Sequence, residues 1–595
     1  MRKTKWLLFG YVGLILLLIG GMGVSFKFTP PRDPHLLYLE YGGTIRTLDP
    51  AEVNDTVGAA FCGQMYECLY NYKFGVRPYE LIPELASAMP EYSPDNTVVT
   101  IHLRKGIHFY DPDKKVFPDG VGPEVKARDF IYSFKRICDF NLGSSNYSVV
   151  FEGNIVGLDD WWDYTKNTPP EKVDWDRPVK GFEAPDDWTI RLTLTHPYPQ
   201  LIYNLAQVPT AVVSKDAVRY WGQAFRRHPV GTGPYYIKEL LPEQRVMLEA
   251  SPIYRGKPDI DGNTPVPPAE RLPHIKDVEL DYFDEPVPAW LLFTQGLYDA
   301  GGIPKESFNQ AIRVGTGELT PELAKKGIIL TKSPLAVTEY IGINMMDPVL
   351  GKNKPLRQAL SLAFDRKTYI HNFANDRGEP AIGPIPPGFP TFDPTRVNPY
   401  TQFDLDLARQ KMVEAVKING GPIPPLSLLM RDADTESRQM AEYFSSQMRQ
   451  VGVTLVPEYR DFARWEEMTD NRQTQLFDAG WEADYPDELN FLQLFYGPNA
   501  PAGNVNSTAY VNPKFDALYD QAKVMPDSPE RRKLYRQMEE IVMEDCTWLL
   551  VFYPVDYGLH YDWIGGTKVM DYGYGFRQNI TLDENLRSQR LLGPN

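Results

Sequence analysis

One segment of the chain places aromatic and acidic side chains close enough together to bind a ligand. Trp481, Asp484, Tyr485 and Asp487 fall within seven consecutive positions, after an apolar Leu-Phe pair and a glycine. An aromatic face attracts cations, and a carboxylate taken out of water needs a positive or hydrogen-bonding partner. The segment therefore suits a cationic, partly apolar ligand. It also fits an ordinary strand-to-helix turn in which Asp484 or Asp487 caps the helix, and the residues alone leave both interpretations open.

Familiar catalytic and metal-binding motifs do not occur in the sequence. It contains no H-E-x-x-H, G-x-S-x-G, Walker A, G-x-G-x-x-G or EF-hand pattern. His102 and His108 have the even spacing of one strand face, but such a pair is usually structural rather than a metal site. We therefore expect no enzymatic activity, no cofactor and no metal site. An exported hydrolase or metalloenzyme is a distant alternative.

Strand and helix patterns alternate along the chain and must position the acidic and aromatic segment. Residues of β-branched and aromatic type at period two predict strands within 35–43, 97–109, 189–198 and 245–254. Helical periodicity predicts helices within 126–140, 356–373, 405–420 and 528–546. This mixture indicates α/β or α+β lobes. The proline-rich stretch 380–399 predicts a long exposed loop inside one lobe.

The N-terminus has the properties of an export segment. Residues 6–26 contain no ionisable acid or base and are long enough to cross a bilayer as a helix. The run is longer than the apolar part of a usual signal peptide, no A-x-A site follows it, and no cysteine stands near it for lipid attachment. We favour an uncleaved anchor, with cleavage near Gly23 or Ser25 as the alternative. Three basic residues precede the run, so the remainder is exported in either case.

The exported part is acidic and poor in cysteine. The whole chain has a formal charge of -16, and residues 1–27 contribute four positive charges, so the remainder carries about -20. Such a surface repels phosphate, and nucleic-acid binding is disfavoured. Cys62, Cys68, Cys138 and Cys546 are too few for a disulfide framework. We expect buried free thiols, with one long-range bridge as the alternative.

A series of motifs runs in order along the exported part. The stretch LIPELASAMPEYSPDNTVVTIHLRKGIHFYDP is followed by FPDGVGPEVKARDFIYSFKRI and later by HPVGTGPYYIKELL. TIRTLDPA precedes these segments, and YIGINM, PLRQALSLAFDRKTYI, GWEADYPDELNF and AYVNPKFDALYDQA follow them. Together they resemble the family 5 extracellular solute-binding proteins of ABC importers, over about residues 35–560. The family's best-known members bind oligopeptides and dipeptides.

The resemblance implies an α/β, two-lobed periplasmic-binding-protein fold of type II, cluster C, with an extra subdomain, here preceded by one N-terminal transmembrane helix. The lobes would enclose a ligand, and the closed form would dock on a permease in the cytoplasmic membrane. The implied domains are an anchor and linker at 1–34, a discontinuous lobe 1 at 35–72, 190–280 and 535–595, a subdomain on lobe 1 at 73–189, and lobe 2 at 281–534.

The resemblance also implies roles for individual residues. Asp484 would pair with the α-ammonium of a peptide, next to Trp481 and Tyr485 as aromatic walls. Gly480 and Glu482 would offer backbone groups to the extended peptide, as an added strand does. Two further residues, Asp55 and Thr56, would face the peptide from the other lobe.

Two features depart from the family pattern. Asp478 stands where some oligopeptide binders carry an arginine for the ligand carboxylate, so that carboxylate would bind elsewhere, near Arg472. The lipobox cysteine of many relatives is missing. We expect a monomeric peptide receptor that delivers its ligand to the permease. A non-peptide solute, such as an oligosaccharide, a metal chelate or an opine, is the alternative.

Overall fold

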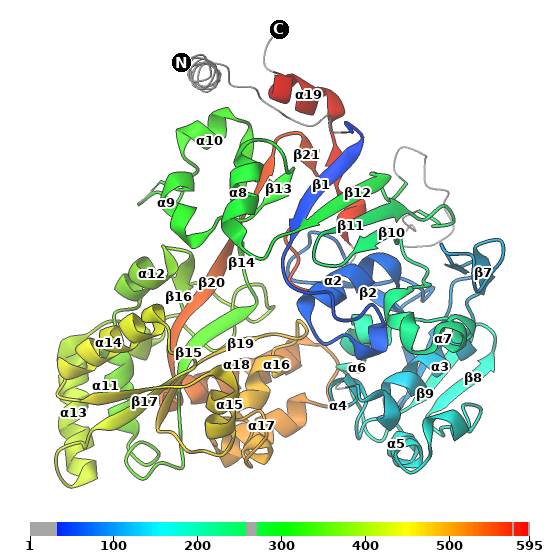
Figure 1. The fold of residues 1–595 in the computed structure, drawn as a ribbon. Coiled ribbons are helices and arrows are strands. Elements are labelled where there is room, and N and C mark those ends of the chain that lie inside the picture. Colours follow the sequence, from blue (N-terminus) through cyan, green and yellow to red (C-terminus); the bar gives the residue numbers. More distant parts are fainter. Residues whose placement is uncertain (1–32, 145, 257–270, 314, 574–575, 593–595) are drawn as a thin grey trace, which may run out of the picture.

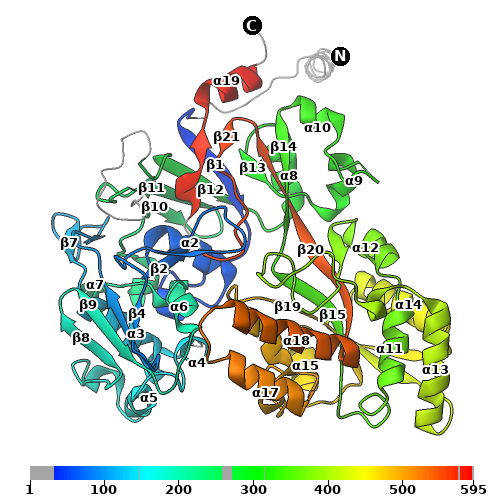
Figure 2. The same ribbon diagram turned by 180° about the vertical axis from the view of Figure 1, so that it is seen from behind.

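The computed structural model describes residues 33–592, except for 145, 257–270, 314 and 574–575. Two lobes stand side by side, as both views show (Figures 1 and 2). The first lobe is built around α2 (Thr56–Met65) and a four-stranded sheet, and the second around a larger mixed sheet. Strands β14 (Ile328–Pro334) and β20 (Trp548–Tyr561) run from near the sheet of the first lobe into the second lobe (Figure 1).

The sheet of the first lobe joins residues from distant parts of the chain. Its order is β1 (Leu36–Tyr41), β12 (Asp277–Tyr282), β11 (Arg245–Ala250) and β10 (Tyr235–Leu241). Because β1 and β12 run parallel, the chain must make a long excursion between them. Part of that excursion forms another four-stranded sheet, in the order β4 (Glu91–Tyr92), β5 (Val98–His102), β9 (Thr189–Thr193) and β8 (Phe182–Asp186). The predicted strands within 35–43, 97–109, 189–198 and 245–254 are confirmed.

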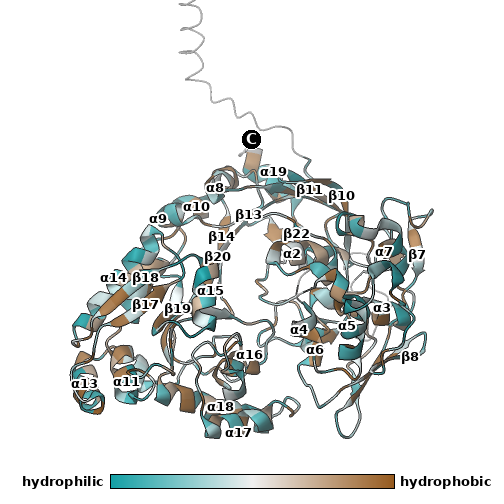
Figure 3. Ribbon diagram, turned by 60° about the horizontal axis from the view of Figure 1, so that its bottom comes forward, coloured by the Kyte–Doolittle hydropathy of each residue, from teal (hydrophilic) through white to brown (hydrophobic). Residues whose placement is uncertain are grey.

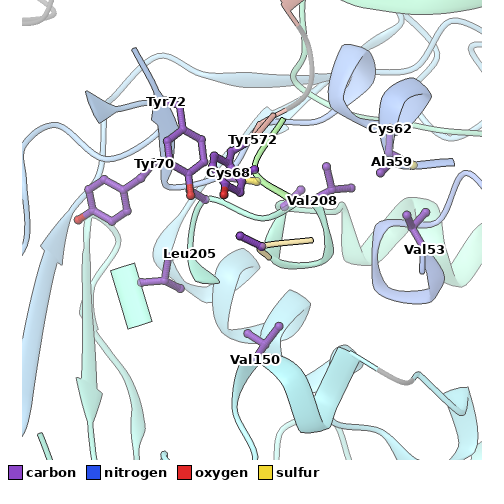
Figure 4. Packing of buried hydrophobic residues seen from close by; sticks show 14 of the residues in the cluster. Val53, Ala59, Cys62, Cys68, Tyr70, Tyr72, Val150, Leu205, Val208 and Tyr572 are labelled. Carbon is purple, nitrogen blue, oxygen red and sulfur yellow. The ribbon is translucent and has the colours of Figure 1, made fainter. Parts of the chain in front are cut away.

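Aromatic and aliphatic side chains from three parts of the chain fill the core of the first lobe. Figure 4 shows Tyr72 of β2 (Tyr70–Tyr72) beside Val208 and Tyr572, all of them buried. Cys62 on α2 and Cys68 lie in the same core. All four cysteines are buried and free, as the sequence predicted. Burial of Tyr572 ties the C-terminal segment to this lobe.

The second lobe contains a mixed sheet of eight strands. The main order is β13 (Ala300–Gly301), β20 (Trp548–Tyr561), β15 (Val337–Ile343), β19 (Leu476–Glu482), β17 (Leu426–Met430) and β18 (Leu455–Tyr459), while β14 (Ile328–Pro334) and β16 (Gly378–Pro380) pair with β20. Its helices are α11 (Lys354–Leu362), α12 (Arg366–Ala374), α13 (Leu405–Asn419), α14 (Thr435–Arg449), α15 (Phe462–Asp470), α16 (Leu489–Leu492), α17 (Pro513–Ala522) and α18 (Pro529–Asp545). A separate apolar core joins Ile341 and Leu428 of the sheet to Phe444 of α14.

Three of the four predicted helical segments form single helices, and one does not. The segments within 126–140, 405–420 and 528–546 become α3 (Ala127–Ile137), α13 and α18. The segment 356–373 breaks into α11 and α12, because the carboxylate of Asp365 accepts a hydrogen bond from the amide of Thr368 and starts a new helix.

The C-terminal part of the chain serves both lobes, which corrects the predicted assignment of 535–595 to lobe 1. Strand β20 has 14 residues and spans roughly 45 Å. Its first part, from Trp548, pairs with β15 in the second lobe, and its last part pairs with β13 and β14. Helix α18 packs on α16 and α17 of the second lobe. A strand pattern shows a period but not which sheet the strand joins, so residue sequence alone could not place this crossing.

The stretch 380–399 is a loop, but the prediction that it is exposed is wrong. Ala381, Ile385 and Phe389 are almost completely buried. The hydroxyl of Tyr553 accepts hydrogen bonds from the amides of residues 382 and 383 and donates one to the carbonyl of Gly383. The loop's prolines lack amide hydrogens, so few backbone donors need partners in the interior.

The described residues include no helix that is both long and apolar enough to span a lipid bilayer. The predicted membrane segment, residues 6–26, lies outside the part of the chain that the structure describes.

Candidate functional site

The candidate site is built on the end of β19, which has one free edge. On one side β19 pairs with β15 over its whole length. On the other side β17 pairs only with Leu476 and Phe477. The amide of Ala483 bonds to the carbonyl of Ala336, which continues the ladder with β15. In an antiparallel pair alternate residues bond to the neighbour, so the backbone groups of Gly480 and Glu482 point to the free edge.

Gly480 permits a close approach between β19 and a side chain of β15. It lies opposite Glu339. A Cβ atom added at position 480 would come within 2.7 Å of the Glu339 carboxylate. A glycine at this position therefore lets the Glu339 side chain lie across the strand next to the free edge.

Asp484 follows β19 and keeps its carboxylate accessible to solvent. Its Oδ2 accepts a hydrogen bond from Nδ2 of Asn490 at 2.9 Å. No ion pair with Asp484 is found among the described residues. Burial by the surrounding protein raises the pKa of Asp484, and the hydrogen bond from Asn490 partly opposes this rise. The carboxylate of Asp484 is thus exposed and has one neutral hydrogen-bond partner among the described residues.

Asn490 positions both Asp484 and Trp481, a role that no sequence pattern indicated. Its side chain is fully buried at the start of α16. Its Oδ1 accepts hydrogen bonds from the Trp481 indole at 2.8 Å and from the Asp484 amide at 3.3 Å. Only the tertiary fold brings the side-chain amide of Asn490 within reach of both Trp481 and Asp484. An asparagine in an ordinary helical stretch carries no signal that could have identified it.

Asp487 has a structural role beside α16, but neither Asp487 nor Asp484 is the N-cap of that helix, because the N-cap position is occupied by Glu488. Asp487 is buried, and its Oδ1 accepts a hydrogen bond from the amide of Leu489 at the first residue of α16. Its Oδ2 lies 2.7 Å from Nη1 of Arg531, and the Tyr535 hydroxyl donates to Oδ1 at 3.0 Å. Both partners lie on α18, which fixes the turn after β19 against that helix.

Tyr485 lies at the contact between the two lobes. Its ring stacks on that of Tyr203, with centroids 5.7 Å apart and an angle of 10° between the planes. A cavity of about 210 Å³ lies beside this contact, lined by Tyr198 and Tyr203 on one side and by Val524 and Arg531 on the other. Tyr485 thus holds the lobes together next to Asp484.

Asp55 and Thr56 stand at the start of α2 in the first lobe. Oδ1 of Asp55 accepts the amide of Gly58 at 2.8 Å and so caps the helix. Its other oxygen is buried and has no hydrogen-bond partner. Thr56 is exposed. In Figure 3, the ribbons of α2 and β22 (Thr581–Leu582) lie opposite those of β14, β20 and α15.

Arg472 does not lie at the site, which corrects the expectation that it binds a ligand carboxylate. It precedes β19, at the end of the strand opposite to Asp484. Its guanidinium donates to the backbone carbonyls of Thr469, Ala500, Pro501 and Asn506. Through these hydrogen bonds the Arg472 side chain connects loops of the second lobe.

The negative charge of Asp478 is balanced inside the protein. Its carboxylate lies 3.2 Å from Nε of Arg431 and accepts that residue's amide at 2.7 Å. The same guanidinium lies 2.8 Å from Glu339. Burial raises the pKa of Asp478 to about 6, although Arg431 opposes the rise. The predicted repulsion of a ligand carboxylate by Asp478 is therefore weakened by its neighbour.

Comparisons with known proteins were made for sequence and for structure. Residues 80–503 match the family described as bacterial extracellular solute-binding proteins, family 5 Middle. The chain is 25% identical over 540 residues to the periplasmic oligopeptide-binding protein OppA of Escherichia coli, with 88% of each chain covered. It is 26% identical over 532 residues to the heme-binding protein A of Haemophilus influenzae, with 87% of each covered.

Solved structures show the same fold. DppA from Helicobacter pylori, in complex with the peptide STSA, matches with a TM-score of 0.66 at 22% identity, covering 92% of this chain and 98% of that chain. HbpA2 from Haemophilus parasuis matches with a TM-score of 0.74 at 22% identity, covering 92% and 100%. The prediction of a two-lobed α/β periplasmic-binding-protein fold is confirmed. The family match spans more than half of the sequence, and the chain belongs to family 5 of the bacterial extracellular solute-binding proteins.

Proposed function

We propose that this chain is the substrate-binding protein of an ABC importer, which captures peptides between its two lobes and delivers them to a permease in the cytoplasmic membrane. The family match and the names of the relatives support an importer. The relatives include binders named for oligopeptides, glutathione and heme. The features around β19 favour the peptide among these ligands.

The observation that carries the proposal is an acceptor site for an ammonium group beside a free strand edge. Asp484 has a single neutral partner and no ion pair within the described part of the chain. A peptide's α-ammonium would supply the missing positive charge. The peptide backbone would then pair with Gly480 and Glu482 as an additional strand. Such binding depends on the main chain and tolerates different side chains.

The aromatic and first-lobe residues would complete the enclosure. Trp481 is held by Asn490 and would form part of the wall. Asp55 and Thr56 would face the peptide from α2, where one buried oxygen of Asp55 has no partner. Closure of the lobes about the crossing strands would bury the peptide. The Tyr203–Tyr485 stack lies where the two lobes would then meet.

The domain boundaries, the anchor and the assembly state belong to the same proposal. Residues 73–189 would form the subdomain of the first lobe, and the segment 1–34 would tether the receptor to the outer face of the cytoplasmic membrane through an uncleaved helix. The receptor would act as a monomer. The mass of the mature N-terminus tests the tether, because cleavage near Gly23 would remove most of the apolar run.

The test of peptide capture is calorimetry of the full-length protein in detergent with a random tetrapeptide pool. We expect saturable binding that Asp484→Asn weakens by about 2–5 kcal/mol, because the ammonium would lose its charged partner. Asp160→Asn, at an exposed position on α5 (Leu158–Lys166), is the matched control and should bind like the wild type. Equal affinity of Asp484→Asn and the control would eliminate the ammonium site.

A non-peptide solute is the second candidate, favoured by the similarity to a heme-binding protein. Native mass spectrometry of protein purified from its own source would distinguish the two. Peptides released from the cleft support the proposal, whereas a sugar, a metal chelate or a porphyrin would replace it.

A further inference from the structure

A second cavity, of about 330 Å³, lies where the crossing strands meet the first lobe. Gln64 of α2 lines it on one side, and His560 of β20 lines it on the other. The segment Gly566–Met570 and the side chain of Arg577 complete the wall. The cavity therefore has walls from α2 of the first lobe and from the crossing strand β20.

The described residues around this cavity supply positive charge and no carboxylate. Lys568 and Arg577 line it, and no ion pair of either is found within the described part of the chain. Arg577 is half-buried, and within the described residues its guanidinium makes one long hydrogen bond, of 3.4 Å, to the carbonyl of Ala60. Burial lowers the pKa of Arg577 to about 10. A cation placed in this way costs free energy until an anion joins it.

A neutral group in the wall also lacks a partner. Gln64 is 2% exposed, and its Oε1 is buried without a hydrogen bond. His560 is almost fully buried, burial lowers its pKa, and its Nε2 lies 3.3 Å from the Thr567 hydroxyl. The wall thus combines two cations with polar groups that a ligand can satisfy.

The cavity lies close to the acidic end of the proposed peptide site. Asp571 and Tyr572 directly follow the cavity-lining Met570, and the extended backbone covers two residues in about 7 Å. Asp571 itself is paired with Arg77 at 2.8 Å. Arg77 donates to the carbonyl of Pro334 at 2.9 Å, and two residues further on the carbonyl of Ala336 accepts the amide of Ala483, the neighbour of Asp484. The negative charge of Asp484 and the positive charges of Lys568 and Arg577 at the cavity match a zwitterionic ligand.

We propose that this cavity binds a carboxylate of the ligand captured between the lobes, with Arg577 and Lys568 as its cationic partners. The inference rests on the proposed function and supplies the carboxylate site that Arg472 does not provide. Arg431 is the other cation near β19, but Glu339 and Asp478 already engage it. The ligand would span from Asp484 to the cavity, with its ammonium at one end and its carboxylate at the other.

The test compares two tetrapeptide pools, one with free carboxyl ends and one with C-terminal amides, by calorimetry on the full-length protein. We expect the wild type to bind the free-acid pool about tenfold to a hundredfold more tightly, the range for a charge-assisted hydrogen bond. Arg577→Gln should lose this preference, and Arg577→Lys should recover part of it. Lys568→Gln, at an exposed position, should reduce the preference without any risk to folding.

Lys417→Gln, at an exposed position on α13 of the second lobe, is the matched control and should keep the full preference. A third pool, amidated but ending in glutamate, distinguishes a terminal from a side-chain carboxylate. A preference for this pool that disappears in Arg577→Gln supports the cavity with a side-chain source. Equal binding of acid and amide pools by the wild type, or an unchanged preference in both Arg577→Gln and Lys568→Gln, overturns the inference while peptide capture stands. Failure of the wild type to bind any pool overturns both.

Discussion

Asp484 and Asp487 lie three residues apart in one turn, yet their surroundings are opposite. Asp487 is 3% exposed and bonded to Arg531, Tyr535 and a backbone amide. Asp484 is accessible, and within the described part of the chain its side chain is bonded through the side-chain amide of Asn490 alone. A carboxylate that the protein itself neutralises holds the fold together, and one that it leaves without a cation is available to a ligand. The comparison separates structural from binding residues more clearly than residue type does.

The largest expected effect comes from disrupting the buried ion pair between Asp487 and Arg531. Arg531→Met leaves Asp487 buried without its cation, so we expect a loss of about 3–5 kcal/mol in the free energy of unfolding. Urea denaturation measures this loss. The double variant Asp487→Asn with Arg531→Met should recover most of it, since no uncompensated charge then remains. A single variant as stable as the wild type would contradict the structural role of Asp487.

An intermediate effect is expected at Asn490, whose side chain hydrogen-bonds to both Trp481 and Asp484. Asn490→Ala removes the partner of both Trp481 and Asp484, which would weaken peptide binding by about tenfold and cost about 1–3 kcal/mol of stability. Calorimetry and urea denaturation on the same preparation measure the two changes. Asn419→Ala, at the end of α13, is the control and should leave binding unchanged. If Asn490→Ala lost stability but kept full affinity, orientation by Asn490 would not matter for the ligand.

The smallest effect concerns Glu488, the buried neighbour of Asp487. Burial, and next to it the charge of Asp487, raises the pKa of Glu488 from 4.5 to about 7. The folded state then holds this proton more tightly than the unfolded chain, so its contribution to stability is present below pH 4.5 and is lost as the pH rises to about 7.

Glu488→Gln should therefore reduce the loss of unfolding free energy between pH 4.5 and 7 by on the order of 1 kcal/mol. Denaturation at several pH values within this window measures the slope. Glu171→Gln, at an exposed position, is the control and should keep the wild-type slope. An unchanged slope in Glu488→Gln would mean that this carboxylate does not hold a proton in the folded state.

Much of the fold was predictable because it depends on local patterns. The alternation within 35–43 and 245–254 predicted strands of the first lobe, and helical periodicity within 528–546 predicted α18. The loop 380–399 was recognised from its prolines, but its burial was not. Burial depends on Tyr553, more than 150 residues away, whose hydroxyl satisfies the loop's backbone.

The candidate site was predictable only in part. Trp481 and Asp484 could be selected from residue type, spacing and resemblance, and they do share a partner. The expectation for Arg472 does not agree with the structure, because its guanidinium donates to backbone carbonyls of loops that the sequence alone could not place beside it. Asn490, Arg431 and Arg577 carried no local signal. Their contacts join segments that are far apart along the chain.

The sequence by itself determined the periods of the strands and helices, the family, and which side chains could carry charge or aromatic surface. The tertiary structure decided which charges are neutralised. Among the described residues, it placed an arginine at Asp487 and none at Asp484, and it left one edge of β19 unpaired beyond Phe477. The reason is physical: whether a carboxylate is free or satisfied depends on distances of a few ångströms to groups that only long-range packing brings together.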